Sequence, residues 1–156
     1  AQTAYSAAKP VVDSRNPMLL AVGAIDPPNG TAIGYYSSQG PTNDCRRKPD
    51  ISAPAGMFSY VFSQATPGNP TFSGTSAASP TAAGAAAVLV WANLAQPGID
   101  LATKMRSYTL DRGAPGFDNA FGMGAVQLPE PFTPGAPGSA SAGTANRTAV
   151  RIPIGC

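Results

Sequence analysis

The chain has 156 residues, which is enough for one domain with a sizeable hydrophobic core. Only 12 % of the residues are charged, and a formal net charge of +2 is too small to indicate nucleic-acid binding or attraction to a membrane surface. No apolar run reaches the roughly 18 residues that a membrane-spanning helix needs. The 17 glycines and 17 prolines favour a loop-rich extracellular protein over a helical cytosolic one.

Charge is distributed unevenly along the chain. No Asp, Glu, Lys or Arg occurs between Ile51 and Ile99, which predicts that this span lies at the centre of a larger body. The single basic run, Arg46-Arg47-Lys48, is interpreted as a solvated loop face. The sequence starts at Ala1 without an initiator Met or a signal-peptide layout, so we expect an internal position of a longer precursor.

Short apolar runs in the first half of the chain predict β-strands. They are a buried strand at Met18–Ile25, an edge-like strand at Ala32–Ser37, and two strands at Ile51–Ala53 and Tyr60–Phe62. Polar, Pro- and Gly-rich segments between these runs predict turns and loops.

Two helices are predicted in the second half. Ala82–Leu94 is an unbroken apolar run, which indicates a helix buried on all sides with Pro80 in its first turn. Gln96-Pro97-Gly98 ends this helix. Asp100 is placed to N-cap a second helix that runs to about Thr109.

The composition changes sharply after residue 128. Residues 129–146 are rich in Pro, Gly, Ala and Ser and are typical of a linker. Residues 147–156 alternate enough to form a C-terminal strand or the start of a further module. We therefore predict a domain over 1–128, a linker over 129–146 and a C-terminal segment over 147–156.

The two cysteines, Cys45 and Cys156, are candidates for one disulfide, which would indicate an oxidising compartment. Closing so long a loop would stabilise the fold by about 4–5 kcal/mol in the chain-entropy model. Free thiols, or pairing with another chain, remain as alternatives.

Ser76 is the candidate nucleophile. Gly74 permits a sharp turn before it, and the helix that follows directs its positive dipole end and free N–H groups at this position. A developing oxyanion would be stabilised there. The alternative is that Ser76 only caps the helix, a common use of serine that the spacing alone favours.

A longer pattern changes that balance. Residues 74–80, GTSAASP, are followed by Ala83-Gly84, and together they closely resemble the nucleophile motif of the subtilisin-like serine peptidases. The residues that carry the motif besides Ser76 are Gly74, Thr75, Pro80 and Gly84. Two departures are Ala77, where the family usually has Met, and Thr81, where it usually has a non-catalytic His.

Three further segments resemble the same family in the family's order. Ala21–Asp26 is similar to a strand and turn, Ser37–Thr42 to a serine-rich strand end, and Lys48–Gly56 to the loop that leads towards the nucleophile. Phe121–Ala125 resembles the glycine-punctuated close of the peptidase domain. The resemblance covers about Asn16 to Leu128.

The resemblance implies an α/β fold with a mostly parallel sheet flanked by helices, incomplete in this chain. It also implies an extracellular endopeptidase that hydrolyses peptide bonds through an acyl-enzyme, with Ser76 as nucleophile and backbone oxyanion donor. The sequence has no His, and a serine needs an adjacent base. We therefore expect Asp, His and the oxyanion Asn on an N-terminal portion of the same precursor, outside this chain, which alone would be inactive.

The alternative function is a non-catalytic structural or interaction subunit that keeps the fold and has lost the triad. Retention of Gly74-Thr75-Ser76 favours the peptidase, whereas Ala77 and Thr81 weigh slightly towards the alternative. The residues that precede Ala1 would separate the two.

The resemblance further implies peptide or protein substrates, secretion or display at the cell surface, and no required cofactor. A structural Ca or Na ion near Asp50, with carbonyl ligands around Ser14–Leu19, is a candidate cation site. Its alternative is that Asp50 caps a turn.

Overall fold

The computed structural model of the chain describes residues 16–26, 31–42, 45–60, 65 and 71–129. Their regular elements, in chain order, are β1 (Val22–Asp26), β2 (Ala32–Ile33), β3 (Ile51–Pro54), β4 (Met57–Phe58), β5 (Thr71–Phe72), α2 (Thr75–Trp91), α3 (Ile99–Ser107), β6 (Thr109–Leu110) and β7 (Ala125–Val126). Residues 130–146 of the predicted linker and the C-terminal segment 147–156, which includes Cys156, lie outside the described residues.

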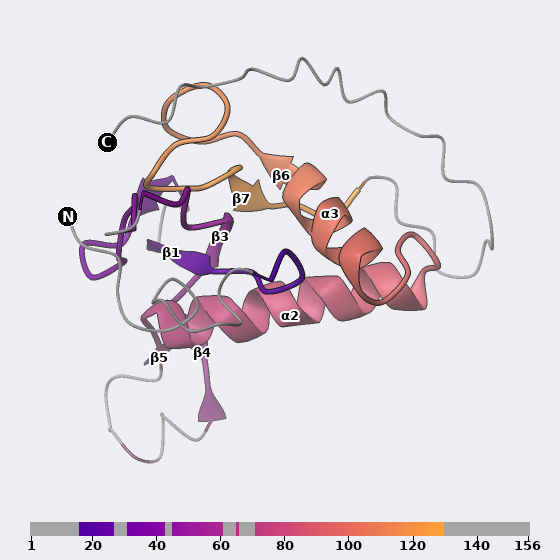
Figure 1. The fold of residues 1–156 in the computed structure, drawn as a ribbon. Helices are drawn as coiled ribbons and strands as arrows, with labels where there is room; N and C mark the ends of the chain where they lie inside the picture. The colour runs from indigo at the N-terminus through magenta and orange to yellow at the C-terminus, as the bar shows by residue number, and fades with distance from the viewer. Residues whose placement is uncertain (1–15, 27–30, 43–44, 61–64, 66–70, 130–156) are drawn as a thin grey trace.

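The main sheet has five strands in the order β2-β1-β3-β7-β6 (Figure 1). Its three central strands run parallel, because β1 pairs with β3 from Val22↔Ile51 onward and β3 pairs with β7 at Ser52↔Ala125. Each edge strand is antiparallel to its neighbour. The sheet is therefore mixed but parallel at its centre, as expected for the α/β fold.

The long helix α2 packs against β1 and β3 and also contacts α3 (Figure 1). Ala77, Ala78 and Leu89 are fully buried on its inner face, where they meet Ala24 and Ile51 of the sheet. Alanines at these contacts let the helix approach the sheet closely, and the interior is packed accordingly. This packing fixes the start of α2 relative to the strands.

The glycine-punctuated segment after α3 closes the sheet. Gly122 has φ 71°, and a Cβ there would lie 2.5 Å from the carbonyl carbon of Asp50. Only glycine allows the backbone to pass this close with that φ. The contact brings β7 beside β3, where the Ser52 hydroxyl donates a hydrogen bond to the Gly124 carbonyl oxygen at 3.1 Å.

Several details differ from the sequence-based expectations for the strands and α3, and β2 covers only Ala32–Ile33 of the strand expected over Ala32–Ser37. Tyr60 is helical rather than extended, while residues 61 and 62 of that predicted strand lie outside the described residues. The strand before it is β4, which pairs with β5 in a separate two-stranded sheet. Asp100 does not cap α3: Gly98 is the cap residue, and the Asp100 carboxylate accepts a hydrogen bond from the Gln96 amide at 2.7 Å.

The prediction for α2 is also corrected. The helix begins at Thr75, so Pro80 lies inside it and not in its first turn. It is not buried on all sides, because Ala83, Gly84 and Ala87 are exposed and Trp91 is 63 % exposed. One face of the helix is thus left uncovered by the described part of the chain.

Candidate active site

Ser76 is the second residue of α2, and its side chain is exposed. The antiparallel pair β4–β5 leads the chain into the helix: β5 ends at Phe72, and Ser73 and Gly74 form the turn. Gly74 has φ 84° and ψ 176°, a conformation that is essentially confined to glycine. A tight glycine turn therefore delivers the serine to the very start of the helix.

The capping interpretation of Ser76 does not hold in this geometry. Gly74 is the N-cap residue, and no side chain caps the helix. Because Thr75 and Ser76 are its first two residues, their N–H groups have no acceptor within the helix. Within the described residues, no hydrogen bond occupies the Ser76 hydroxyl. The hydroxyl lies beside free amide donors at the positive end of a helix.

The residues that share the motif with Ser76 have distinct structural roles. Pro80 has no N–H, so the helical hydrogen bond to the Ser76 carbonyl is missing. Thr81, at the position where the motif usually carries His, donates its hydroxyl to the Ala77 carbonyl at 2.9 Å. A Cβ at position 84 would have no neighbour within 4 Å, so nothing in the described chain requires a glycine there.

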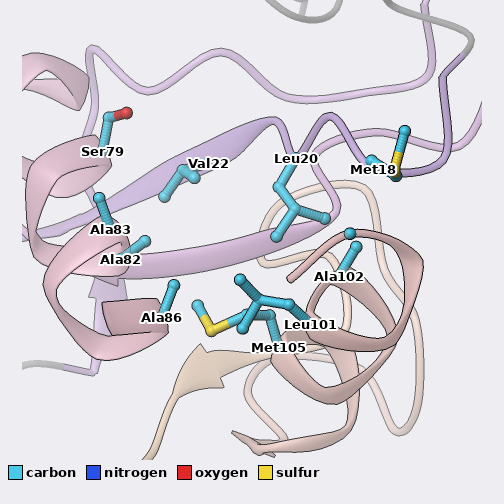
Figure 2. A pocket seen from close by; sticks show the side chains of 11 residues that line it. Met18, Leu20, Val22, Ser79, Ala82, Ala83, Ala86, Leu101, Ala102 and Met105 are labelled. Atoms are coloured by element: carbon cyan, nitrogen blue, oxygen red, sulfur yellow. The ribbon is translucent and has the colours of Figure 1, made fainter. Parts of the chain in front are cut away.

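A cavity of about 320 Å³ lies between α2, α3 and the chain leading into β1 (Figure 2). Its lining is mostly apolar, with Leu20, Leu101 and Met105 closing it on one side and alanines of α2 on the other. Ser79 lines it, but Ser76 does not. The cavity is therefore separate from the candidate nucleophile and resembles an uncovered packing surface more than a substrate pocket.

Asp50, the candidate cation ligand, is occupied by cationic side chains. Its Oδ2 lies 2.5 Å from Lys48 Nζ and accepts the Ala21 N–H at 2.8 Å. Its Oδ1 lies 3.0 Å from Arg106 Nη2. A carboxylate already shared by two cations has little affinity left for a metal ion. The described residues contain no group of three or more His, Cys, Asp or Glu side chains that is placed to bind a metal.

The interpretation of the basic run as a solvated loop face is corrected for Lys48, whereas Arg47 is exposed as expected. Lys48 is buried with its side chain on Asp50, so it belongs to the interior rather than to a solvated loop face. Arg47 lies over the ring of Phe117, 3.9 Å from the centroid. Lys48 is held in the ion pair and cannot serve as a base for Ser76.

Two functional candidates carry no motif signal of their own. The hydroxyl of Tyr36 donates a hydrogen bond to Oδ1 of Asp26. Burial raises the pKa of Tyr36, and the bond to Asp26 and its charge raise it further, while the Gly74 amide acts in the opposite direction. Asp26 ends one of the family-like segments and Tyr36 directly precedes another, which is the only hint in the sequence.

The remaining site prediction concerns the cysteines. Among the described residues no cysteine is a free thiol, so the Cys45 sulfur is engaged. Cys156 lies outside those residues, and the pairing of the two stays a prediction.

Comparison with known families decides the assignment. The model of the subtilase family, peptidase S8, matches residues 2–124, which is most of the chain. The chain belongs to the subtilase family. No curated protein matches the sequence significantly. This subtilase domain includes the Gly74 turn, Ser76 and the whole of α2, so the motif resemblance and the fold agree.

Membership makes the chain a subtilisin-like serine peptidase domain, a class of hydrolase that acts on peptides and proteins. In the described part of this subtilase, no helix is both long enough and apolar enough to cross a membrane.

Proposed function

We propose that this chain is the nucleophile-bearing, C-terminal part of an extracellular subtilisin-like serine endopeptidase. The observation that carries the proposal is the exposed Ser76 hydroxyl at the start of α2, which is not used for capping. It follows a glycine turn and lies beside the first backbone N–H groups of α2, which have no carbonyl acceptor within the helix. These are the features that a serine nucleophile requires, together with a base.

The chemistry is an acyl transfer in two steps. A base takes the proton from Ser76 Oγ, the oxygen attacks the scissile carbonyl, and the N–H of Ser76 stabilises the resulting oxyanion. The same proton goes to the leaving amine as the peptide bond breaks, which leaves an ester on Ser76. Water, deprotonated by the base, then hydrolyses the ester and restores the hydroxyl.

The base is expected from outside this sequence, which contains no His. Lys48 is tied to Asp50, and Lys104 lies over the ring of Tyr108, 6.0 Å from its centroid. We propose that an N-terminal portion of the same precursor supplies Asp, His and the oxyanion Asn. The uncovered face of α2 and the apolar cavity beside it support this, because they offer that portion a surface to pack against.

The extracellular assignment rests on composition and on the cysteines. The chain has few charges and many glycines and prolines, and Cys45 is not a free thiol. A stable disulfide requires an oxidising compartment. Secretion or display at the cell surface is accordingly part of the proposal.

A second function is a non-catalytic structural subunit of the same fold. The observation in its favour is the bond from Thr81 to the Ala77 carbonyl, since both positions depart from the usual motif. Such a subunit would keep the packing of α2 and need no base near Ser76.

Peptidase activity of the native protein separates the two functions. Hydrolysis of an unstructured protein substrate is measured for the wild type, for Ser76→Ala and for Ser79→Ala, an exposed serine one turn further along the same helix. We expect Ser76→Ala to lose on the order of 10⁶-fold in kcat and Ser79→Ala to keep it. Absence of turnover in the wild type would establish the structural subunit, and turnover that survives in Ser76→Ala would refute Ser76 as nucleophile.

A further inference from the structure

The antiparallel pair β4–β5 extends away from the main sheet, below α2 in Figure 1. Consecutive side chains of a strand point to opposite faces, so Met57 and Phe58 lie on different faces of the pair. Phe58 is 84 % exposed, and Met57 is exposed as well. Tyr60, two residues beyond Phe58, is 80 % exposed. The pair therefore carries large apolar side chains that the described part of the chain does not cover.

The outer edge of β4 is open as well. In the described part of the chain β4 pairs with β5 alone, so its other edge has no strand partner. Proteins usually protect such an edge with charged side chains or proline. β4 has neither, and no Asp, Glu, Lys or Arg occurs between Ile51 and Ile99. An exposed, apolar and uncharged edge is a place where an extended polypeptide adds as a further strand.

The strand β5 connects this edge to the candidate nucleophile. It ends at Phe72, which pairs with Met57 of β4, and Ser76 follows four residues later. Four residues of chain span at most about 14 Å, and paired strands lie about 5 Å apart. A polypeptide with its scissile bond at Ser76 therefore needs about six extended residues on one side of that bond to reach β4.

We propose that Phe58, Tyr60 and the open edge of β4, together called the β4 surface, bind an extended, uncharged and apolar segment of the protein substrate. The inference rests on the proposed peptidase function and adds a substrate class to it, namely unfolded polypeptides that carry such a segment about six residues from the cleaved bond. The β4 surface lies apart from the reacting atoms, so its residues bind the substrate and take no part in the chemistry.

The size of the β4 surface favours a substrate over a second copy of the chain or the N-terminal portion. A stable protein–protein interface buries about 800 Å² on each partner. The β4 surface consists of a two-residue strand and a few exposed side chains. A substrate is held at Ser76 at the same time, so its contact with β4 is intramolecular and a small surface is sufficient.

The test compares the complete wild-type peptidase with Phe58→Ser and with Leu110→Ser. Leu110 is the matched control, because it is an exposed apolar residue of the edge strand β6, on the other side of α2 (Figure 1). Two peptides with the same scissile bond serve as substrates. The short peptide has about two residues on each side of the bond, and the long peptide has about eight uncharged, mainly apolar residues on each side.

A contact that is remote from the reacting atoms changes KM more than kcat. We expect the ratio of KM for the long peptide to KM for the short peptide to rise about 3- to 10-fold in Phe58→Ser. The ratio should keep its wild-type value in Leu110→Ser. A wild-type ratio in Phe58→Ser, or an equal rise in both variants, would overturn the inference.

Binding of the fluorescently labelled long peptide to the complete Ser76→Ala protein gives a measurement that does not depend on catalysis. Adding Phe58→Ser should weaken the Kd by about 3- to 10-fold. An unchanged Kd would overturn the inference. It would also be overturned if Phe58→Ser abolished a dimer or released the N-terminal portion, because one of these would then cover the β4 surface. Inactivity of the wild-type peptidase would instead refute the proposed function, and the Kd would still decide whether the β4 surface binds the segment.

Discussion

Arg106 of α3 and Asp50, the residue before β3, form an ion pair, with Nη2 3.0 Å from Oδ1, although they lie 56 positions apart in the chain. Lys48 binds the other carboxylate oxygen, and the amide of Ala21 donates to it as well. One carboxylate thus joins the segment before β1, the start of β3 and the helix α3.

This arrangement predicts unequal effects of removing its members. Asp50→Ala leaves Lys48 buried without a counter-ion and should lower the free energy of unfolding by about 3–5 kcal/mol. Arg106→Ala should cost less, because Lys48 still neutralises Asp50 and Arg106 is partly exposed to water. Urea unfolding of the isolated protein measures both, with Ser107→Ala as an exposed control on the same helix. A larger loss for Arg106→Ala would contradict this account of the network.

The contact of Gly122 with Asp50 predicts a strong glycine requirement. Gly122→Ala places a Cβ 2.6 Å from the Asp50 carbonyl oxygen at φ 71°, and should destabilise the fold by on the order of 3 kcal/mol. Gly116→Ala is the matched control, since Gly116 has φ 80° but no neighbour within 4 Å. Gly116→Ala should lower the free energy of unfolding by about 1 kcal/mol, because only the backbone conformation is unfavourable for alanine there. Equal losses of melting temperature in Gly122→Ala and Gly116→Ala would show that the close approach of residue 122 to Asp50 is unimportant.

The raised pKa of Tyr36 predicts a pH dependence of stability. Its folded-state pKa lies above the ordinary value of 10.0, so the neutral hydroxyl is favoured in the folded protein. The stabilisation is fully present below pH 10 and is lost as pH rises through the folded pKa, because the unfolded chain ionises first. Unfolding measured from pH 8 to 11 should show a steeper loss for the wild type than for Tyr36→Phe. Superimposable curves of stability against pH for the two proteins would exclude a raised pKa of Tyr36.

Cys45 is predicted to be oxidised in the mature protein, either to Cys156 or to a partner chain. Intact mass after alkylation, with and without prior reduction, measures the number of free thiols. We expect no alkylation of the unreduced native protein, and peptide mapping should recover the bridge. Two alkylated thiols without reduction would contradict both the pairing and the extracellular assignment.

Local signals in the sequence account for most of the fold near Ser76. The apolar runs at β1 and β3 and the small-residue run of α2 place strand, strand and helix correctly, because each pattern reports burial over consecutive residues. α2 begins at Thr75, ahead of the first turn that was expected around Pro80. Thr75, Ser76 and Ser79 have weak helix propensity and are exposed, so the local sequence gives little signal for the first turn of the helix.

Contacts between segments that lie far apart in the sequence could not be predicted from local sequence patterns. The sequence neighbours of Asp50 give no sign of its ion pair with Arg106, which arrives from α3. The bond from Tyr36 to Asp26 depends on the register of β1 with β2, and a two-residue strand gives no periodic signal. The strand β4 likewise exists only through its pairing with β5. Such contacts follow from the tertiary fold and not from local pattern.

The most direct test of the account is covalent labelling of Ser76 with a fluorophosphonate probe. The chain is produced alone and together with the N-terminal portion of its precursor, and each sample is labelled, digested and mapped. We predict labelling at Ser76 only when the N-terminal portion is present, because the base that activates the hydroxyl is supplied there. Labelling of the isolated chain at Ser76, or no labelling of the complete protein, would contradict the central claim.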